Sequence, residues 1–235
     1  MSVTVACFDL FSTLVDVGQV PEGVGRFTAD ILGVDRQRWN EACFGPAHEI
    51  CRPTDPLETL TKIAHSLDPQ IPHALIEQAV LERQRRFDHA LLHVSTAVLH
   101  ALQLLRERGI RLALISNASS SEVAAWPESP LSSLFEVATF SCHSGCMKPQ
   151  VEIYSLTARQ LQVQPQDCLF IGDGGSDEHH GAHAVGMKPV LVTHFINSQE
   201  QQARLARYAK VLSGVVQDFY ELHARWDELT NCGGI

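Results

Sequence analysis

The sequence predicts an α/β protein, a doubly wound, Rossmann-like parallel sheet with a helical segment inserted near its start. Two observations lead to this class. From about residue 96 onward, short apolar runs alternate with helical patterns, as the β/α units of parallel sheets do. Before that point one apolar run, residues 3–8, is followed by a long stretch without a strand pattern. The chain has 235 residues, 45% of them hydrophobic, so it can bury a core of this size.

The first predicted strand covers residues 3–8 and ends at Asp9. Its β-branched and apolar composition indicates a strand buried on both faces. Turn formers in residues 12–18 predict a tight loop after it. In the stretch that follows, Pro, Gly and Asp residues separate four predicted helices. These helices cover 25–32, 36–49, 56–66 and 72–90, and the last carries Arg83, Arg85 and Arg86 at positions that we interpret as polar.

The rest of the chain alternates between the two patterns. Strands are predicted at 111–115, 137–140, 168–171 and 189–193, with an edge strand at 211–216. Helices are predicted at 97–108, from 120–125, at 152–161, through 181–185 and at 197–210, before a loose tail at 231–235. Ligands of such sheets bind outside the carboxyl ends of the strands. The residues that follow each strand are therefore the candidates for a site.

Polar groups follow four of the predicted strands. They are Asp9, the pair Ser116 and Asn117, Lys148, and the acids Asp173, Asp177 and Glu178. One chemistry needs this set together, in which a carboxylate attacks the substrate and forms a covalent intermediate. The hydroxyl, amide and lysine groups would hold the oxygens of the transferred group. The acidic run would hold a hard cation, and magnesium prefers such carboxylate ligands.

With these residues in this order, the chain resembles the haloacid dehalogenase-like (HAD) hydrolase superfamily. The run FDLFSTL at residues 8–14 resembles motif I, Ser116 opens motif II, Lys148 matches motif III, and residues 172–178 resemble motif IV. The resemblance implies a HAD core catalytic domain made of residues 1–18 and 92–235. It also implies that residues 19–91 form an α-helical cap domain, which closes over the site and selects substrates.

The resemblance also implies roles for individual residues. The catalytic residues would be Asp9, Thr13, Ser116 and Lys148. Ser12 and Asn117 would bind the substrate, and Arg52 of the cap is a candidate clamp for its anionic group. Magnesium would be held by Asp9, the backbone carbonyl of Phe11, Asp173, and Asp177 or Glu178. Counting back from Gly181 favours Glu178, and counting forward from Asp173 favours Asp177, so both remain candidates.

Phe11 is the main departure from the pattern of the superfamily. Its phosphatases carry a second Asp at this position, which protonates the leaving group, and Phe11 cannot do so. The 2-haloacid dehalogenases of the superfamily carry an aromatic residue there and use no metal. The acids of residues 173–178 favour a metal, however. His179 is a hypothetical substitute for the missing proton donor.

The preferred interpretation is a magnesium-dependent HAD hydrolase that acts as a phosphatase on a small phosphorylated metabolite. The alternatives are 2-haloacid dehalogenation and a catalytically weak, binding or regulatory HAD protein. A formal charge of −9 argues against nucleic acid as a partner, because phosphate contacts need clustered Lys and Arg. The start of the chain lacks the features of a secretory signal, and no run is long enough to span a bilayer. Seven cysteines without framework spacing favour the reducing cytoplasm. We expect a small anionic substrate and no membrane partner, and the sequence makes no prediction of the oligomeric state.

Overall fold

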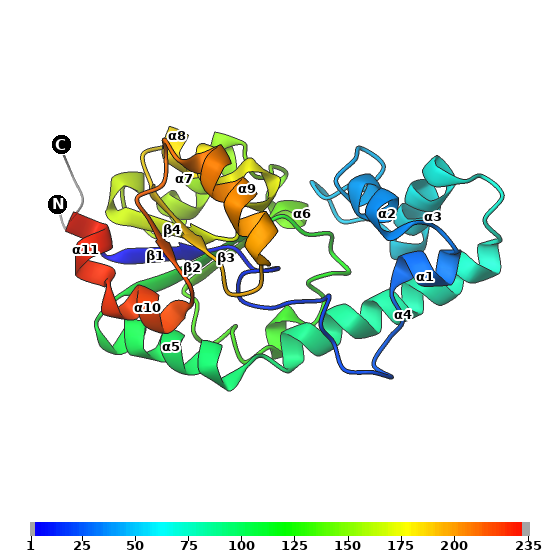
Figure 1. Ribbon diagram of the computed structural model, residues 1–235, viewed down its shortest axis with the longest axis horizontal. Coiled ribbons are helices and arrows are strands. Elements are labelled where there is room, and N and C mark those ends of the chain that lie inside the picture. Colours follow the sequence, from blue (N-terminus) through cyan, green and yellow to red (C-terminus); the bar gives the residue numbers. More distant parts are fainter. Residues whose placement is uncertain (1–2, 232–235) are drawn as a thin grey trace.

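The computed structural model describes residues 3–231. Six parallel strands form one sheet in the order β3-β2-β1-β4-β5-β6, which confirms the predicted fold class (Figure 1). The strands are β1 (Val5–Phe8), β2 (Arg111–Ser116), β3 (Val137–Phe140), β4 (Cys168–Gly172), β5 (Lys188–Val192) and β6 (Gly214–Val216). All five predicted strands after residue 96 are present, although β6 is shorter than its predicted range.

The register of the sheet brings the ends of its central strands level. Phe8 pairs with Leu114 of β2 on one side and with Ile171 of β4 on the other. The next residue, Asp9, still donates its backbone N–H to the Ile171 carbonyl, at 2.9 Å. The polar residues that follow β1, β2 and β4 therefore lie along the same edge of the sheet.

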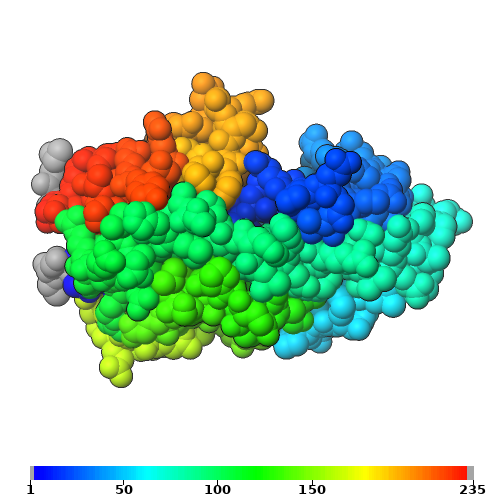
Figure 2. Space-filling view, turned by 90° about the horizontal axis from the view of Figure 1, so that it is seen from below, coloured from blue at the N-terminus to red at the C-terminus, as the bar shows by residue number. Residues whose placement is uncertain are grey.

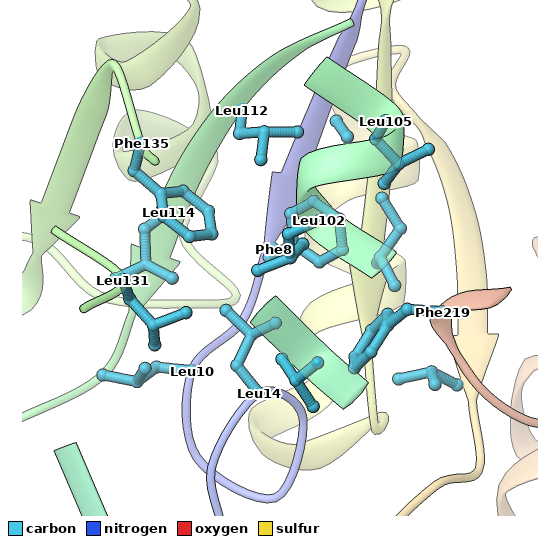
Figure 3. Packing of buried hydrophobic residues seen from close by; sticks show 14 of the residues in the cluster. Phe8, Leu10, Leu14, Leu102, Leu105, Leu112, Leu114, Leu131, Phe135 and Phe219 are labelled. Carbon is cyan, nitrogen blue, oxygen red and sulfur yellow. The ribbon is translucent and has the colours of Figure 1, made fainter. Parts of the chain in front are cut away.

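Helices cover both faces of the sheet because successive strand residues point to opposite sides. On one face Phe8 and Leu114 pack against Leu102 of α5 and Phe219 of α10 (Figure 3). On the other face Cys7 and its neighbours pack against α7 and α8. The flanking elements are α5 (Thr96–Glu107), α6 (Ser141–Ser144), α7 (Val151–Gln160), α8 (Glu178–Ala184), α9 (Ser198–Tyr208), α10 (Phe219–Ala224) and α11 (Trp226–Asn231). Three short 3-10 turns are η1 (Trp126–Glu128), η2 (Pro165–Asp167) and η3 (Gly175–Asp177).

Four helices between β1 and α5 surround a separate apolar cluster at one end of the molecule (Figure 1). They are α1 (Thr28–Leu32), α2 (Arg36–Cys43), α3 (Pro56–Leu67) and α4 (His73–Leu92), and we call them the helical unit. Asp35 and Asp55 begin α2 and α3 by accepting backbone N–H bonds at their N-caps. Trp39 and Ile63 lie at the centre of the cluster, each 1% exposed. Seen from below, the atoms of α4 and α5 form a continuous band along the molecule, which begins at the helical unit (Figure 2).

Several predicted elements differ from the observed ones. The helix predicted at 36–49 ends at Cys43, because Gly45 and Pro46 follow and Pro cannot continue a helical bond pattern. Residues 120–125 form turns instead of a helix start. Helices α10 and α11 lie in a segment where no element was predicted. Of the predicted tail, residue 231 ends α11, and residues 232–235 lie outside the described residues.

Arg86 also differs from its interpretation as a polar position of its helix. Its side chain is buried, with 3% exposure. The guanidinium donates to the Val17 carbonyl and lies over the Phe27 ring, 4.5 Å from the centroid. Burial lowers the pKa of Arg86 to about 10. Arg86 thus joins α4 to the segment that leads from β1 into the helical unit.

Two further predictions were that the chain lacks a membrane-spanning segment and that its cysteines are free thiols. Within residues 3–231, no helix combines the length and the apolar character needed to cross a membrane. The six cysteines in that range, Cys7, Cys43, Cys51, Cys142, Cys146 and Cys168, are free thiols.

Candidate active site

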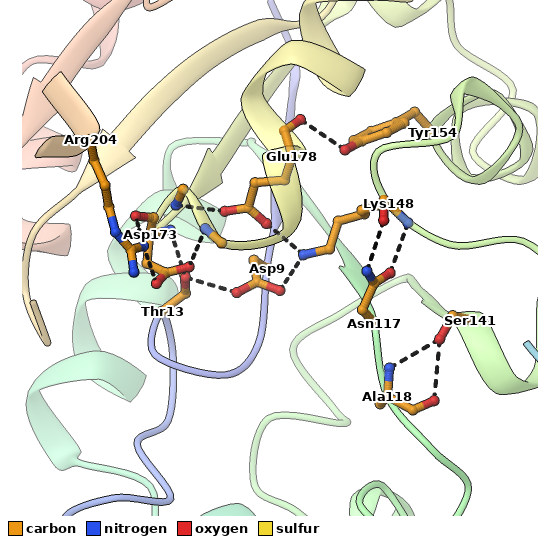
Figure 4. Close-up of polar contacts among 12 residues, drawn as sticks. Asp9, Thr13, Asn117, Ala118, Ser141, Lys148, Tyr154, Asp173, Glu178 and Arg204 are labelled. Carbon is orange, nitrogen blue, oxygen red and sulfur yellow. Dashed lines mark hydrogen bonds and ion pairs between the residues drawn. The ribbon is translucent and has the colours of Figure 1, made fainter. Parts of the chain in front are cut away.

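Asp9 lies at the carboxyl end of β1, where two side chains hold its carboxylate (Figure 4). The Lys148 ammonium donates to Oδ1, and the Thr13 hydroxyl donates to Oδ2 at 3.0 Å. Thr13 in turn accepts the Asp173 backbone N–H at 3.0 Å. Both oxygens of Asp9 are therefore fixed in direction, although the residue is 6% exposed. A carboxylate whose two oxygens are fixed in this way is suited to nucleophilic attack.

Lys148 joins Asp9 to a second acid. Its ammonium lies 2.6 Å from Glu178 Oε2, and all three side chains are buried. Burial alone would lower the pKa of Lys148, but the two carboxylates outweigh it and raise the pKa above its usual range. Burial also raises the pKa of Glu178 to about 8, which Asp9 and Asp173 reinforce and Lys148 opposes. Lys148 is thus a permanent cation between two acids.

The position of Glu178 depends on a glycine and a tyrosine. The Glu178 carboxylate occupies the space beside Gly172, where an added Cβ would lie 2.1 Å from Oε1. Its Oε1 accepts the Gly174 N–H at 2.8 Å, and Tyr154 donates its hydroxyl to the Glu178 carbonyl at 2.8 Å. The absence of a side chain at Gly172 therefore leaves the space at the end of β4 that this carboxylate occupies.

Asp173 follows β4 directly and is paired with an arginine. Arg204 of α9 donates to the Asp173 carboxylate and to its carbonyl (Figure 4). Burial raises the pKa of Asp173, as does the charge of Asp9, and Arg204 opposes both. The Gly175 N–H also donates to the carboxylate, at 3.1 Å. The sequence did not identify Arg204 as a site residue, because the pattern of its helix does not show which group the Arg204 side chain contacts.

The two candidate acids of motif IV point in different directions. Asp177 is 37% exposed in its side chain and pairs with His180 and Arg207, at 2.7 and 3.1 Å. Glu178 points inward to Lys148. Ser176 and Asp177 both adopt left-handed backbone angles, with φ of 51° and 54°, which turn the chain between them and α8. The structure therefore groups Glu178, and not Asp177, with the other acids.

Asn117 and Ser116 follow β2 and serve different contacts. Asn117 forms a reciprocal pair with the Lys148 backbone, accepting its N–H at 2.8 Å and donating to its carbonyl at 2.9 Å. The amide that was expected to bind substrate thus positions the lysine segment. The Ser116 hydroxyl is buried and has no hydrogen-bond partner within residues 3–231. Ser12 has a left-handed φ of 58° and lines a cavity described below.

Arg52 does not reach this group of residues. Its side chain is 68% exposed and lies 3.6 Å from Glu49. His179 is also apart from it, fully buried with its ring packed edge to face against Phe170 and Tyr208. Burial lowers the pKa of His179 to about 3, so the ring is neutral. A sequestered neutral ring does not suit the proton-donor role that the sequence suggested.

Phe11 lies between the site and the helical unit. Its ring packs edge to face against Phe87 of α4, with 5.2 Å between centroids. Both rings line a cavity of about 330 Å³, together with Ser12, Trp39, His48, Arg83 and Glu122. A second cavity of about 270 Å³ shares His48 and is lined by Asn117, Met147 and Ser176. Space for a small molecule thus exists between the helical unit and the polar edge of the sheet.

The acids of the site form one group that suits a hard cation. Oxygens of Asp9, Asp173 and Glu178 all lie within 4.8 Å of one another, and all three residues are buried. Lys148 and Arg204 supply two positive charges against these three carboxylates. Oxygen ligands and a remaining negative charge are what magnesium prefers. The residues present therefore fit the metal that the sequence predicts.

Comparisons with known proteins agree with this architecture. A family model described as haloacid dehalogenase-like hydrolase matches residues 3–184. The chain is 24% identical over 215 residues to bifunctional epoxide hydrolase 2 of Rattus norvegicus, covering 82% of this chain and 37% of that protein. It is 32% identical over 134 residues to enolase-phosphatase E1 of Drosophila virilis, covering 56% of this chain and 51% of that protein. The chain thus spans about half or less of the length of these curated relatives.

Solved structures share the fold over almost their whole length. The L-2-haloacid dehalogenase from Xanthobacter autotrophicus superposes with a TM-score of 0.67 at 17% identity, covering 96% of this chain and 98% of that one. The putative beta-phosphoglucomutase from Thermotoga maritima has a TM-score of 0.66 at 20% identity, covering 95% and 98%. At these identities the likeness is one of fold.

Proposed function

The chain belongs to the haloacid dehalogenase-like hydrolase family, and we propose that it is a magnesium-dependent phosphatase acting on a small phosphorylated metabolite. One observation carries the proposal. The Asp9 carboxylate is held by Thr13 and Lys148 beside two further buried acids, Asp173 and Glu178. A nucleophile next to a cation site is the arrangement that attack on an anionic phosphoryl group requires.

In the proposed reaction, an Asp9 oxygen attacks phosphorus while the bond to the leaving group breaks. Lys148 would hold oxygens of the transferred group, because its ammonium already faces Asp9 and stays charged. The unpartnered Ser116 hydroxyl at the end of β2 would donate to another of these oxygens. Water would then attack phosphorus and release phosphate from Asp9. Asn117 and Thr13 would keep Lys148 and Asp9 in place throughout.

Asp9, Asp173 and Glu178 would hold the magnesium ion, with the Phe11 carbonyl as a further candidate ligand. Bound magnesium would supply the positive charge that lets an anionic substrate approach a carboxylate. Asp177 is set aside as a ligand in this proposal because it pairs with His180 and Arg207.

We further propose that residues 19–91 form a cap domain over a core made of 1–18 and 92–235. The separate apolar cluster of the helical unit supports this division. The cavities lined by residues of both parts are the proposed substrate space. A cytoplasmic location fits the free thiols of residues 3–231 and remains a prediction.

Hydrolytic dehalogenation of a short 2-haloacid is a second candidate function, and Phe11 is the observation that favours it. Halide needs no proton to leave, and the Phe11 side chain offers none. The buried acids Asp173 and Glu178 favour the phosphatase, because with Asp9 they form a group of oxygen ligands suited to Mg²⁺, which displacement of halide does not need.

The test compares purified wild type with D9N on 4-nitrophenyl phosphate, with and without Mg²⁺. We expect phosphate release that requires Mg²⁺ and falls below detection in D9N, because the amide cannot form the covalent intermediate. D177N is the matched control and should stay within about threefold of wild type, since Asp177 faces solvent.

The other functions predict different results in the same series. Metal-independent chloride release from 2-chloropropionate, lost in D9N, would replace the phosphatase with the dehalogenase. Inertness towards both substrates with Mg²⁺ still bound would favour a binding or regulatory protein.

A further inference from the structure

We infer that Arg204 of α9, together with Tyr208 on the next turn, positions the loop after β4 so that Asp173 can bind a magnesium ion. The inference rests on the magnesium site of the proposed function. A carboxylate that binds a metal is commonly held by further hydrogen bonds, and loss of such a partner typically weakens metal binding by about 10–100-fold. Arg204 is such a partner for Asp173.

Arg204 contacts Asp173 at two points. Its Nη1 group donates to Oδ2 of the Asp173 carboxylate and also to the Asp173 backbone carbonyl. A donor shared by the side chain and the main chain of one residue restricts rotation about the bonds between them. The side chains are 22% exposed for Arg204 and 7% for Asp173, so water has little access to replace these contacts. Arg204 therefore limits the directions in which the Asp173 carboxylate can point.

Tyr208 holds the next residue of the same loop. It is fully buried and donates its hydroxyl to the Gly174 carbonyl at 2.8 Å. Arg204 and Tyr208 are four residues apart in α9, so their side chains lie on one face of the helix. The carbonyls of two successive residues, Asp173 and Gly174, thus both accept hydrogen bonds from α9.

Gly174 allows α9 to lie this close to the loop. An added Cβ at Gly174 would lie 2.9 Å from Cε2 of Tyr208 and 3.3 Å from Cδ of Arg204. The residue also has a φ of 88°, in the left-handed region that favours glycine. The apolar part of the Arg204 side chain therefore packs on the loop backbone, in addition to its polar contacts.

The helix that carries these two side chains is itself fixed in place. Its first turn has a capping box, in which the Asn197 side chain accepts the Glu200 N–H at 3.0 Å and the Glu200 side chain accepts the Asn197 N–H at 3.1 Å. Strand β5 precedes α9 and strand β6 follows it in the same sheet. The helix is thus a firm support for the loop.

Arg204 lies beside the group of acids and not between its members. In the view of Figure 4 it is on the side of Asp173 away from Asp9 and Lys148. Each carboxylate oxygen has two lone pairs, so an Asp173 oxygen that accepts from Arg204 can still bind a cation. We therefore assign Arg204 a positioning role next to a metal ligand.

The test measures the dissociation constant of Mg²⁺ by isothermal titration calorimetry for wild type, R204Q and R204K. R204Q removes the charge and both contacts, whereas R204K keeps the charge on a side chain that is one bond shorter. We expect the dissociation constant to rise by about 10–100-fold in R204Q. In R204K it should rise by at least about fivefold, because the place of the donor matters as well as its charge.

R207Q is the matched control. It removes the same charge from the same helix, but Arg207 is 59% exposed and pairs with Asp177, outside the group of acids. Its dissociation constant for Mg²⁺ should stay within about threefold of wild type, because exposed charges are screened by water and salt.

Y208F tests the second contact, since it removes one hydroxyl and keeps the buried ring. We expect a dissociation constant between those of wild type and R204Q, because the Gly174 carbonyl loses its donor while Asp173 keeps Arg204. An unchanged value would contradict the role of Tyr208. Loss of folded protein alone would lower the number of sites per chain and not the affinity of each site. If R204Q does not fold by circular dichroism, R204K and Y208F carry the test.

Two results for R204Q would overturn the inference while leaving the phosphatase standing. An unchanged dissociation constant would show that Asp173 needs no support, and tighter binding would show that Arg204 competes with the metal. If wild type itself binds no Mg²⁺, the proposed magnesium site fails and the inference falls with it.

Discussion

At the sheet edge, acids and cations alternate through direct contacts. Asp9, Lys148 and Glu178 form a chain of contacts, and Asp173 pairs with Arg204 beside them. Each buried charge has an opposite partner, which is the condition under which burial of charge is tolerated. Three carboxyl groups face two cations, and the raised pKa values of Asp173 and Glu178 reflect the missing positive charge that a metal ion would supply.

His179 shows how burial alone changes a residue in the same segment. Its pKa of about 3 in the folded chain compares with about 6.5 for an unperturbed histidine. The unfolded chain therefore binds a proton at pH 5 that the folded chain does not. This residue contributes stability that is present above about pH 6.5 and is lost as the pH falls towards 3.

The variant H179L should remove that contribution. We expect its free energy of unfolding to improve relative to wild type as the pH falls from 7 to 4.5, measured by urea denaturation at each pH. H183L, at an exposed position of the same helix, should keep the wild-type slope because His179 remains. A difference between H179L and wild type that does not vary with pH would contradict the argument.

Among the elements, α4 holds the helical unit and the sheet together. Phe87 packs on Phe11, Arg83 reaches Glu122, and Arg86 donates to the Val17 carbonyl. These contacts lie on one side of the helix. From the sequence we interpreted Arg83, Arg85 and Arg86 as polar positions of the helix. The sequence could not show which of them contact the rest of the chain, because a polarity pattern does not identify the group that a side chain faces.

The variant R86M should destabilise the protein by about 1–3 kcal/mol, because it leaves the part-buried Val17 carbonyl without its donor. The midpoint and slope of urea denaturation measure the effect. R85M is the matched control, since the Arg85 side chain is 64% exposed, and it should change stability by less than about 0.5 kcal/mol. Equal effects in the two variants would show that burial of Arg86 is not what matters.

The molecule as a whole contains separate apolar clusters, and the candidate site lies beside the boundary between two of them. Trp39 is central to the cluster of the helical unit, whereas Phe8 belongs to the cluster beneath the sheet. The cavities occur where residues of both parts meet. If residues 19–91 are a domain, as proposed, the helical unit can open locally without loss of the sheet.

The variant W39A should therefore loosen one part selectively. Loss of a fully buried Trp costs about 3–5 kcal/mol, and we expect amide hydrogen exchange to rise across α1–α4 with β1, β2 and β4 still protected. F44A is the control, because Phe44 is 78% exposed on the same unit and should leave exchange unchanged. Faster exchange across the sheet in W39A would argue against residues 19–91 as a domain.

The sequence by itself determined the sheet and the order of the groups along its edge. Apolar strands buried on both faces have few alternatives, and their carboxyl ends must meet, so Asp9, Lys148 and Asp173 were predictable neighbours. Local turn chemistry and caps likewise predicted where α2 and α3 begin.

Other features were decided by the tertiary structure, because they depend on which side chains face one another. Two left-handed residues before α8 turn Asp177 outward and Glu178 inward, which counting along the chain did not resolve. Arg204 reaches Asp173 from a helix that is distant in sequence. A strand end is fixed by local pattern, whereas the partner of a buried charge is fixed by packing across elements, and that requires the folded chain.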